Sequence, residues 1–174
     1  GAIKQDIAER KASEARVQHL AHHDQLTDLP NRALLTDRLF QALAQARRDR
    51  QTLALMFLDL DRLKPVNDTL GHDVGDLLLK EVALRLRACV PRDSDTVSRL
   101  GGDEFVILLA QIERAADAVL VARKLLTALS HPFVIGPYDV RISGSIGIAV
   151  YPQHGGDVNG LLKNADTAMY YAKQ

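Results

Sequence analysis

Two short acidic segments hold the residues of this sequence that are best suited to chemistry. Asp59 and Asp61 follow the apolar segment 53–58, and Asp103 and Glu104 lie in a segment with turn character. Desolvated carboxylates repel one another, so a fold that brings the two segments together needs a cation. Few hard oxygen ligands, completed by substrate phosphates, favour Mg²⁺, with Mn²⁺ as a substitute. Each segment alone also fits an ordinary solvated turn.

Two glycines precede the second acidic segment. Gly101 and Gly102 carry no Cβ, so the backbone there can come close to a ligand. Carboxylates arranged in this way can hold two cations about 4 Å apart, which promotes in-line phosphoryl transfer. The pattern therefore favours phosphoryl or nucleotidyl transfer.

The composition restricts the class of protein. A chain of 174 residues with 47% hydrophobic residues supports one compact domain. A net charge of +0 argues against binding to a nucleic-acid polymer. The single cysteine, Cys89, excludes an internal disulfide and favours a reducing, cytoplasmic location. No signal peptide or membrane-spanning segment is evident, although a parent protein could still be anchored to a membrane.

Hydrophobic periodicity predicts alternating helices and strands. Helices are expected at 3–21, 32–48, 76–89, 112–130 and 159–173. Strands are expected at 53–58, 96–100 and 105–109, together with a hairpin over 133–151 that turns at Gly136-Pro137. The stretch before Gly75 is expected to be polar and irregular. This order predicts an α+β fold of the split βαβ kind, ferredoxin-like or polymerase-palm-like, with an antiparallel sheet packed with helices.

The first predicted helix has a narrow apolar stripe. Its apolar residues are interrupted by Arg10 and Glu14, so a lone helix of this kind usually needs a partner. We expect residues 1–21 to be a signalling or linker helix and residues 22–174 to be the catalytic domain. A coiled coil and a solvated linker are both compatible with the helix.

Residues 101–105, GGDEF, resemble the motif that names the GGDEF family, the diguanylate cyclases. The resemblance extends from about His22 to the end of the chain, with further similar segments in the family's order. These are HDQLTDLPNR (23–32), DLDRLKPVND (59–68), GHDVGD (71–76), SIGIA (145–149) and ADTAMYYAK (165–173). The resemblance implies an Mg²⁺-dependent enzyme that condenses two GTP into cyclic di-GMP and two pyrophosphates.

The resemblance implies a metal site at the two acidic segments. Asp59 and Asp103 would bind Mg²⁺ through carboxylates, and Leu60 would bind it through its backbone carbonyl. Glu104 would be a further ligand or the base that helps to deprotonate the ribose 3′-hydroxyl. Asp103 and Glu104, with Lys64, are thus the expected catalytic residues.

The resemblance also implies the contacts to GTP. Lys64 and Lys173 would bind the triphosphate, and Asn67 and Asp76 would read the guanine. An amide and a carboxylate suit the hydrogen-bonding edge of guanine better than that of adenine. The remaining residues expected near the substrate are Gly101, Gly102, Leu63 and His72, and His72 is expected to make a structural hydrogen bond.

The sequence departs from the family pattern in three ways. Leu63 stands where Phe is usual, which alters packing beside the guanine, and Asp28 replaces a common Gly in a loop. The chain stops at Gln174, whereas the family continues into a short basic stretch, so a phosphate contact from there is expected to be missing. The resemblance also implies that Asp24 and Arg32 form an ion pair that holds the opening loop.

Arg92 and Asp95 form a second candidate site. An Arg-x-x-Asp pair at this place resembles the family's inhibitory site, which binds the product. Arg92 can fork onto guanine O6 and N7, and Asp95 can accept from a guanine amide edge. Arg123 or Lys124 would complete the site. A solvated, charged turn is the alternative.

The implied partners are a second copy of the domain, GTP, and cyclic di-GMP as an allosteric inhibitor. The sequences near both ends of the domain resemble those of proteins in which a PAS sensor domain precedes this domain and an EAL phosphodiesterase domain follows it. A catalytically weak GTP-binding domain that regulates such a phosphodiesterase is therefore an alternative function. A receptor that binds the product through Arg92 and Asp95 alone is a third.

Overall fold

The computed structural model describes all residues from Gly1 to Gln174. The helices are α1 (Ala2–His22), α2 (Arg32–Asp49), α3 (Leu63–Leu70), α4 (His72–Cys89), α5 (Ala115–Ser130) and α6 (Val158–Ala172). The strands are β1 (Thr52–Asp61), β2 (Thr96–Gly101), β3 (Glu104–Ile112), β4 (Phe133–Ile135), β5 (Tyr138–Val140) and β6 (Ser143–Tyr151).

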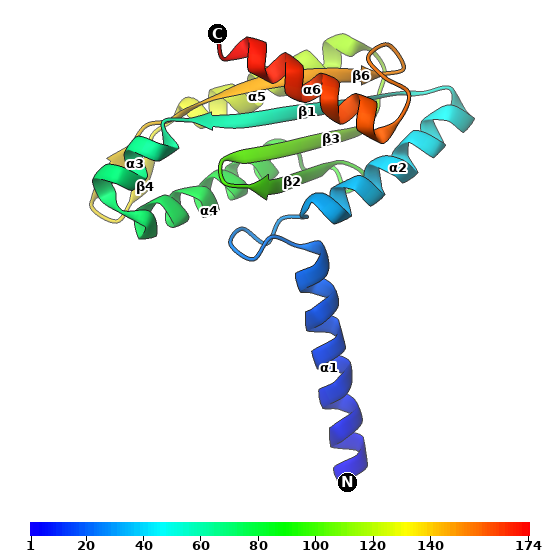
Figure 1. Ribbon diagram of the computed structural model, residues 1–174, viewed down its shortest axis with the longest axis vertical. Helices are drawn as coiled ribbons and strands as arrows, with labels where there is room; N and C mark the ends of the chain where they lie inside the picture. Colours follow the sequence, from blue (N-terminus) through cyan, green and yellow to red (C-terminus); the bar gives the residue numbers. More distant parts are fainter.

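A four-stranded antiparallel sheet in the order β2-β3-β1-β6 forms the centre of the domain (Figure 1). Helices separate β1 from β2 and β3 from β6, so the sheet has the split βαβ connectivity that the sequence predicts. The expected α+β, palm-like fold is confirmed. The central position of β1 explains why its sequence is a continuous apolar run, since both of its faces are covered.

Alternate residues of β1 enter two separate hydrophobic cores. Ala54, Met56 and Leu58 pack with apolar residues of α4 and α5. Leu53, Leu55 and Phe57 lie on the opposite face and pack with α2 and α6, as the two-residue period of a strand requires. The sheet is thus held rigidly between two helical layers, and the ends of its strands are well placed to carry a site.

The packing of α6 on β6 depends on one glycine. A Cβ at Gly147 would lie 2.0 Å from the backbone nitrogen of Met169 and 2.2 Å from the carbonyl oxygen of Ala165. No side chain can occupy this space, so Gly147 lets the helix backbone approach the strand directly. This close approach fixes the course of α6 toward Lys173, the residue that follows it.

The prediction that the polar stretch before Gly75 contains no helix is wrong. The structure has α3 at Leu63–Leu70 and begins α4 at His72, with only Gly71, at φ 93°, between the two helices. Pro65 lies in the first turn of α3, where its missing N–H costs little. Polar side chains concealed α3 and the first turn of α4, because one face of each lies in solvent.

The expected hairpin over 133–151 is also wrong in its pairing. Gly136, at φ 57°, turns the chain, but only β4 and β5 pair there. β6 instead pairs with β1, which gives the main sheet its fourth strand and buries Ala149 and Val150. The helix expected from Ile112 begins only at Ala115, because β3 extends to Ile112.

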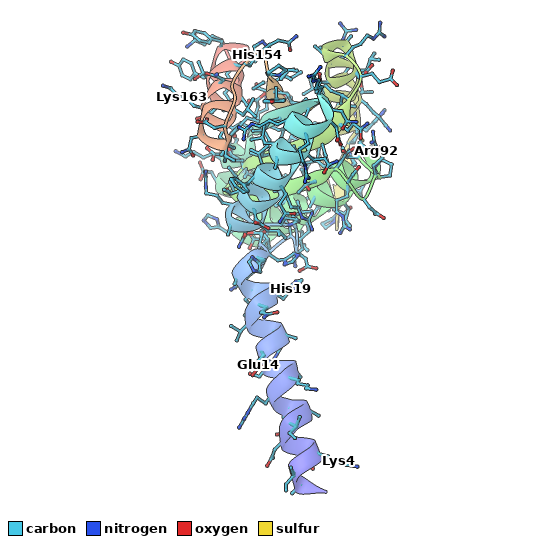
Figure 2. All side chains as sticks on the ribbon, turned by 90° about the vertical axis from the view of Figure 1, so that its right-hand side faces the viewer. Lys4, Glu14, His19, Arg92, His154 and Lys163 are labelled. Carbon is cyan, nitrogen blue, oxygen red and sulfur yellow. The ribbon has the colours of Figure 1, made fainter.

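Helix α1 extends away from the body of the domain (Figure 1). None of its residues is buried, and Lys4 and Glu14 project freely in Figure 2. Its exposed apolar residues include Ile3, Ile7 and Val17. No helix of the structure is long and apolar enough to cross a membrane.

Candidate functional site

The two acidic segments meet at one end of the sheet. Asp59 of β1 lies directly opposite Glu104 of β3, and the backbone N–H of Leu60 donates to the carbonyl oxygen of Asp103 at 3.0 Å. Gly102, at φ 47°, makes the tight turn between β2 and β3 that places Asp103 there. Antiparallel pairing therefore joins carboxylates that are over 40 residues apart.

Asp59 and Asp103 share a partly buried, strongly charged environment. Burial, followed by the neighbouring Asp59 carboxylate, raises the pKa of the Asp103 carboxyl above its ordinary value. Atom Oδ1 of Asp59 is buried and has no hydrogen-bond partner. Such an orphaned carboxylate oxygen is costly unless a cation or donor satisfies it.

Lys173 lies at the edge of this acidic pair. Its Nζ is 2.8 Å from Oδ2 of Asp59 and 3.4 Å from Oδ1 of Asp61. The hydrogen bond to Asp59 is the main reason why the pKa of Lys173 is raised, and it outweighs partial burial. The ammonium group thus offsets part of the negative charge and leaves Oδ1 of Asp59 free.

The donor set fits a hard divalent cation. No group of three or more His, Cys, Asp or Glu side chains converges in the structure. Asp59 and Asp103 supply carboxylate oxygens, and one of these is buried and unsatisfied. An ion held by two carboxylates must complete its shell with backbone, water or substrate oxygens, which is typical of Mg²⁺.

The expected guanine-binding residues lie on α3 and α4. The side chain of Asn67 packs directly over Gly75, where a Cβ would come 1.7 Å from its Oδ1 atom. Gly75 precedes Asp76 on α4, so Asn67 packs against the helix that carries the expected second reader of the base. Leu63 is 7% exposed and belongs to the core, while His72 is exposed at the start of α4.

Lys64 is exposed in the first turn of α3, and β1 leads into this helix through Arg62. Lys64 is therefore close in the chain to Asp59. No hydrogen bond or ion pair joins Lys64 to Asp59 or Asp103, so the role of Lys64 stays a prediction.

The expected Asp24–Arg32 ion pair is wrong. Asp24 pairs with Arg99, whose Nη1 lies 2.9 Å from Oδ1, and Thr27 donates to the same carboxylate through its backbone and hydroxyl. Arg99 also donates through Nε and Nη2 to the carbonyl oxygen of Gly102, at 3.1 and 2.9 Å. Arg99 therefore ties the opening loop to the hairpin between β2 and β3. Asp24 and Arg99 are 75 residues apart, so no local pattern indicated this pair.

We expect the Asp24–Arg99 pair to stabilise the fold in a pH-dependent way. Burial alone would raise the pKa of Asp24, but hydrogen bonds from Thr27 and Arg99 together lower it. A lowered folded-state pKa gives stability that is present above the unfolded value, about 3.9, and lost as pH falls through the folded value. In urea unfolding at about pH 7, Asp24→Asn should lose about 1–2 kcal/mol, and the gap should begin to narrow below about pH 4 and close as pH falls below the folded-state pKa. Asp139→Asn is the matched control, and a gap that persists in acid contradicts the assignment.

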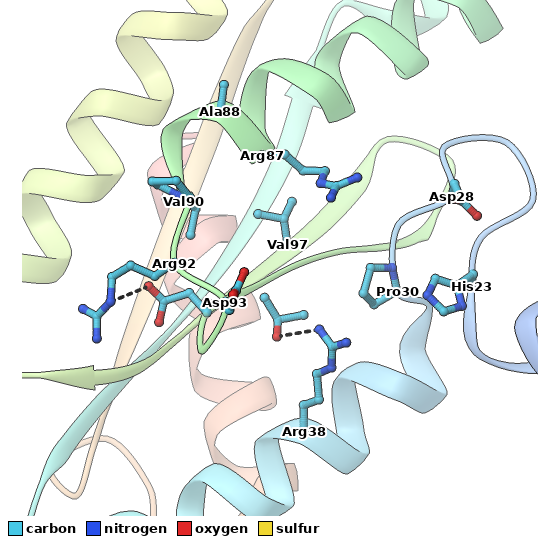
Figure 3. A pocket seen from close by; sticks show the side chains of 13 residues that line it. His23, Asp28, Pro30, Arg38, Arg87, Ala88, Val90, Arg92, Asp93 and Val97 are labelled. Carbon is cyan, nitrogen blue, oxygen red and sulfur yellow. Dashed lines mark hydrogen bonds and ion pairs between the residues drawn. The ribbon is translucent and has the colours of Figure 1, made fainter.

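A cavity of about 590 Å³ lies beside Arg92 and Asp95 (Figure 3). Asp95 is nearly buried and accepts from the backbone N–H of Ala110 at 3.0 Å, while the exposed Arg92 lies 3.8 Å from it. Asp95 is thus fixed to β3, whereas Arg92 is free to meet a ligand.

Two further arginines line this cavity. Arg38 of α2 donates to the hydroxyl of Thr96 at 3.2 Å, and Arg87 lies in the last turn of α4 (Figure 3). Arg123 and Lys124, the expected completing residues, do not line it. Sequence reasoning missed Arg38 because only the fold brings α2 to this place. Arg87 could have been predicted, because it lies only five residues before Arg92, in the last turn of a helix that the sequence predicts.

The antiparallel sheet, with acidic residues at the tip of the hairpin between β2 and β3, is that of a protein with the palm-like α+β fold. The family model "Diguanylate cyclase, GGDEF domain" matches residues 21–174, so the chain belongs to the GGDEF family of diguanylate cyclase domains. The bifunctional diguanylate cyclase/cyclic di-GMP phosphodiesterase MucR of Pseudomonas aeruginosa is 56% identical over 154 residues, 88% of this chain and 22% of MucR.

Other relatives agree with this family. Diguanylate cyclase TpbB of P. aeruginosa is 46% identical over 161 residues, 92% of this chain and 37% of TpbB. The solved GGDEF domain of TpbB superimposes with a TM-score of 0.85 at 46% identity, covering 87% of this chain and 88% of that one. The coiled coil and GGDEF domain of DgcB from Caulobacter crescentus, in complex with c-di-GMP, matches at TM-score 0.81 and 26% identity, covering 99% and 95%. The chain thus spans well under half the length of the curated relatives MucR and TpbB.

Proposed function

We propose that this chain condenses two molecules of GTP into cyclic di-GMP with release of two pyrophosphates. The observation that carries the proposal is the buried, unpartnered Oδ1 of Asp59 beside Asp103, with Lys173 at the edge of the pair. This arrangement suits a divalent cation that is shared with a triphosphate. Membership in the GGDEF family supports the same reaction.

Asp59, Asp103 and the Leu60 carbonyl would hold Mg²⁺, or Mn²⁺ in its place. When bound, the ion supplies Lewis-acid polarisation of the phosphate and makes the 3′-hydroxyl more acidic. Glu104, opposite Asp59 across the strand pair, would be a further ligand or would accept the 3′-hydroxyl proton.

The remaining site residues would bind and orient GTP. Lys64 and Lys173 would neutralise the charge that develops on the leaving pyrophosphate. Asn67 and Asp76 would hydrogen-bond the guanine, beside Leu63. The other residues proposed near the nucleotide are Gly101 and Gly102, whose backbone can approach it, and His72, in a structural role.

One domain supplies only half of the reaction. The active unit would be a homodimer in which the 3′-hydroxyl of each GTP attacks the α-phosphate of the other. Residues 22–174 would form the catalytic domain, and residues 1–21 a helix whose exposed Ile3, Ile7 and Val17 pair with a second copy. In a longer parent protein, this helix would transmit a signal from an upstream sensor domain.

Incubation of the purified chain with GTP and Mg²⁺, followed by chromatography of the products, tests the proposed activity. Cyclic di-GMP should form, and its rate per domain should rise with protein concentration because two domains must meet. A rate per domain that is independent of dilution in a monomeric protein would contradict the dimeric mechanism. An absence of product at all concentrations, with GTP bound, would favour the alternative function.

That alternative is a GTP-binding domain that regulates a neighbouring phosphodiesterase domain. Leu63 in place of the usual Phe supports it. MucR, by its name, combines cyclase with phosphodiesterase activity, so a relative of this domain occurs in a protein that also has phosphodiesterase activity. A receptor that only binds the product at Arg92 and Asp95 is weaker, because the acidic pair would then have no role.

We predict that the domain binds GTP about five- to a hundredfold more tightly than ATP. Adenine would leave the carboxylate of Asp76 or the amide of Asn67 without a matching partner, which costs about 1–3 kcal/mol. Calorimetry with 3′-deoxy nucleotides, which cannot cyclise, measures both affinities without turnover. Equal affinities would show that Asn67 and Asp76 do not read the base.

We further propose that cyclic di-GMP binds in the cavity beside Arg92 and inhibits without competing with GTP. Three arginines at this cavity, Arg38, Arg87 and Arg92, can fork onto guanine edges or phosphates. Asp95, which is fixed by the Ala110 N–H, would accept from a guanine amide edge.

Arg92→Ala should weaken product binding about ten- to a hundredfold, since a bidentate arginine–guanine pair contributes about 1–3 kcal/mol. Synthesis itself should persist, because Arg92 is exposed and contacts none of the acidic residues proposed to bind the metal ion. Progress curves should slow with accumulating product in the parent and in Arg123→Ala, the control outside the cavity, but not in Arg92→Ala. Equal slowing in all three, or displacement of the product by GTP, contradicts the product site.

A further inference from the structure

Asp61, the last residue of β1, has a defined place that the proposed catalytic roles do not use. Its Oδ2 atom accepts from the hydroxyl of Ser143 at 3.0 Å and from that of Ser145 at 3.4 Å. Its Oδ1 atom lies 3.4 Å from Nζ of Lys173. One carboxylate thus joins β6 to the residue that follows α6.

Strand register explains why the carboxylate is held so firmly. Asp61 lies opposite Ser143, and Asp59 lies opposite Ser145. Since side chains two residues apart share a face of a strand, both aspartates and both serines lie on one face. The two hydroxyls therefore orient Asp61 from the neighbouring strand and direct its other oxygen to Lys173.

The ammonium group of Lys173 needs a second carboxylate partner besides Asp59. In the proposed function Asp59 must also serve a divalent cation, and a single carboxylate satisfies two cations less well than one. The carboxylate of Asp61 contacts Lys173 as well and is one-third exposed, beside the partly buried acidic pair. It can therefore retain the ammonium group while Asp59 binds the ion.

We infer that Asp61 is a positioning residue that holds Lys173 in place for the triphosphate and does not itself contact the nucleotide or the metal ion. The inference rests on the proposed function, because it assumes that GTP binds at this site. The inference also predicts whether Asp61→Asn raises or lowers the affinity for GTP. Asp61 is negative, as is the triphosphate, so simple charge repulsion predicts that Asp61→Asn binds GTP more tightly. Positioning of Lys173 predicts weaker binding.

The test measures the affinity of 3′-deoxy-GTP with Mg²⁺, and of 3′-deoxyguanosine as the phosphate-free probe. Asp61→Asn should weaken 3′-deoxy-GTP about five- to tenfold, as expected for a charge-assisted contact, and leave 3′-deoxyguanosine unchanged. Lys173→Met should weaken it at least as much. The double variant should match Lys173→Met, because Asp61 acts only through that lysine. Asp139→Asn is the control for loss of one carboxylate.

Three further measurements keep the inference falsifiable. Ser143→Ala with Ser145→Ala keeps the Asp61 charge but frees the carboxylate, so it should give a smaller loss in the same direction even if Asp61→Asn does not fold. Asp61→Glu should recover part of the affinity. Mn²⁺ binding without nucleotide should be unchanged in Asp61→Asn.

The inference is overturned if Asp61→Asn binds 3′-deoxy-GTP as tightly as the parent or more tightly. It is also overturned if the losses in the double variant add, or if Mn²⁺ binding falls with Asp61. If the parent binds no 3′-deoxy-GTP, the proposed function fails first, and the role of Asp61 fails with it. Binding by the parent and no change in the variants rejects Asp61 alone.

Discussion

Asp103→Ala is expected to lower the rate of cyclic di-GMP synthesis by more than about a hundredfold. The variant removes one of two carboxylates proposed to hold the cation, and such contacts contribute several kcal/mol to the transition state. The turn itself should survive, because the hydrogen bond from Leu60 uses the backbone carbonyl of Asp103. Initial rates at saturating GTP and Mg²⁺ measure the effect.

Stability separates a catalytic role of Asp103 from a structural one. Burial and Asp59 raise the pKa of Asp103, so the folded protein disfavours its charged form. This unfavourable contribution is present at neutral pH and disappears as pH falls below the unfolded value. Asp103→Ala should therefore unfold at the same urea concentration as the parent or a higher one. Near-normal activity, or lost activity with a large loss of stability, would contradict the metal assignment.

Gly147→Ala is expected to destabilise the domain by about 3 kcal/mol. Its Cβ would lie 2.0 Å from a backbone atom of α6, which cannot move aside as a side chain would, so helix and strand must separate. For a domain of this size the melting temperature should fall by about 6–12 °C. Differential scanning calorimetry measures the shift.

Gly156→Ala is the matched control, because a Cβ there meets nothing within 4 Å. Its effect on the melting temperature should be small. The shift of α6 in Gly147→Ala should also displace Lys173 and weaken 3′-deoxy-GTP binding in the protein that remains folded. Equal stability of the two variants would show that α6 does not depend on close contact at Gly147.

Local patterns in the sequence were sufficient for most of the fold. The apolar run of β1, the glycines before Asp103 and the helical stripes each depend on neighbours within a few residues, where periodicity is informative. Predictions failed where the answer depended on a distant partner. The partner of β6 is such a case. Its apolar sequence is compatible with pairing to the neighbouring segment after Phe133, as predicted, and equally with pairing to β1, as the structure has it. Helix α3 was missed because its polar side chains resemble those of a loop.

The sequence alone determined which residues could do chemistry here, namely the carboxylates of Asp59, Asp103 and Glu104, since residue type and local spacing define their possible roles. Only the tertiary structure decided which side chains meet them. Antiparallel pairing of β1 with β3 and β6 brought Asp59 to Asp103 and Asp61 to Ser143. The same fold gave Asp24 its partner Arg99 instead of Arg32, because contacts across 75 residues depend on how the elements pack, which no local pattern encodes.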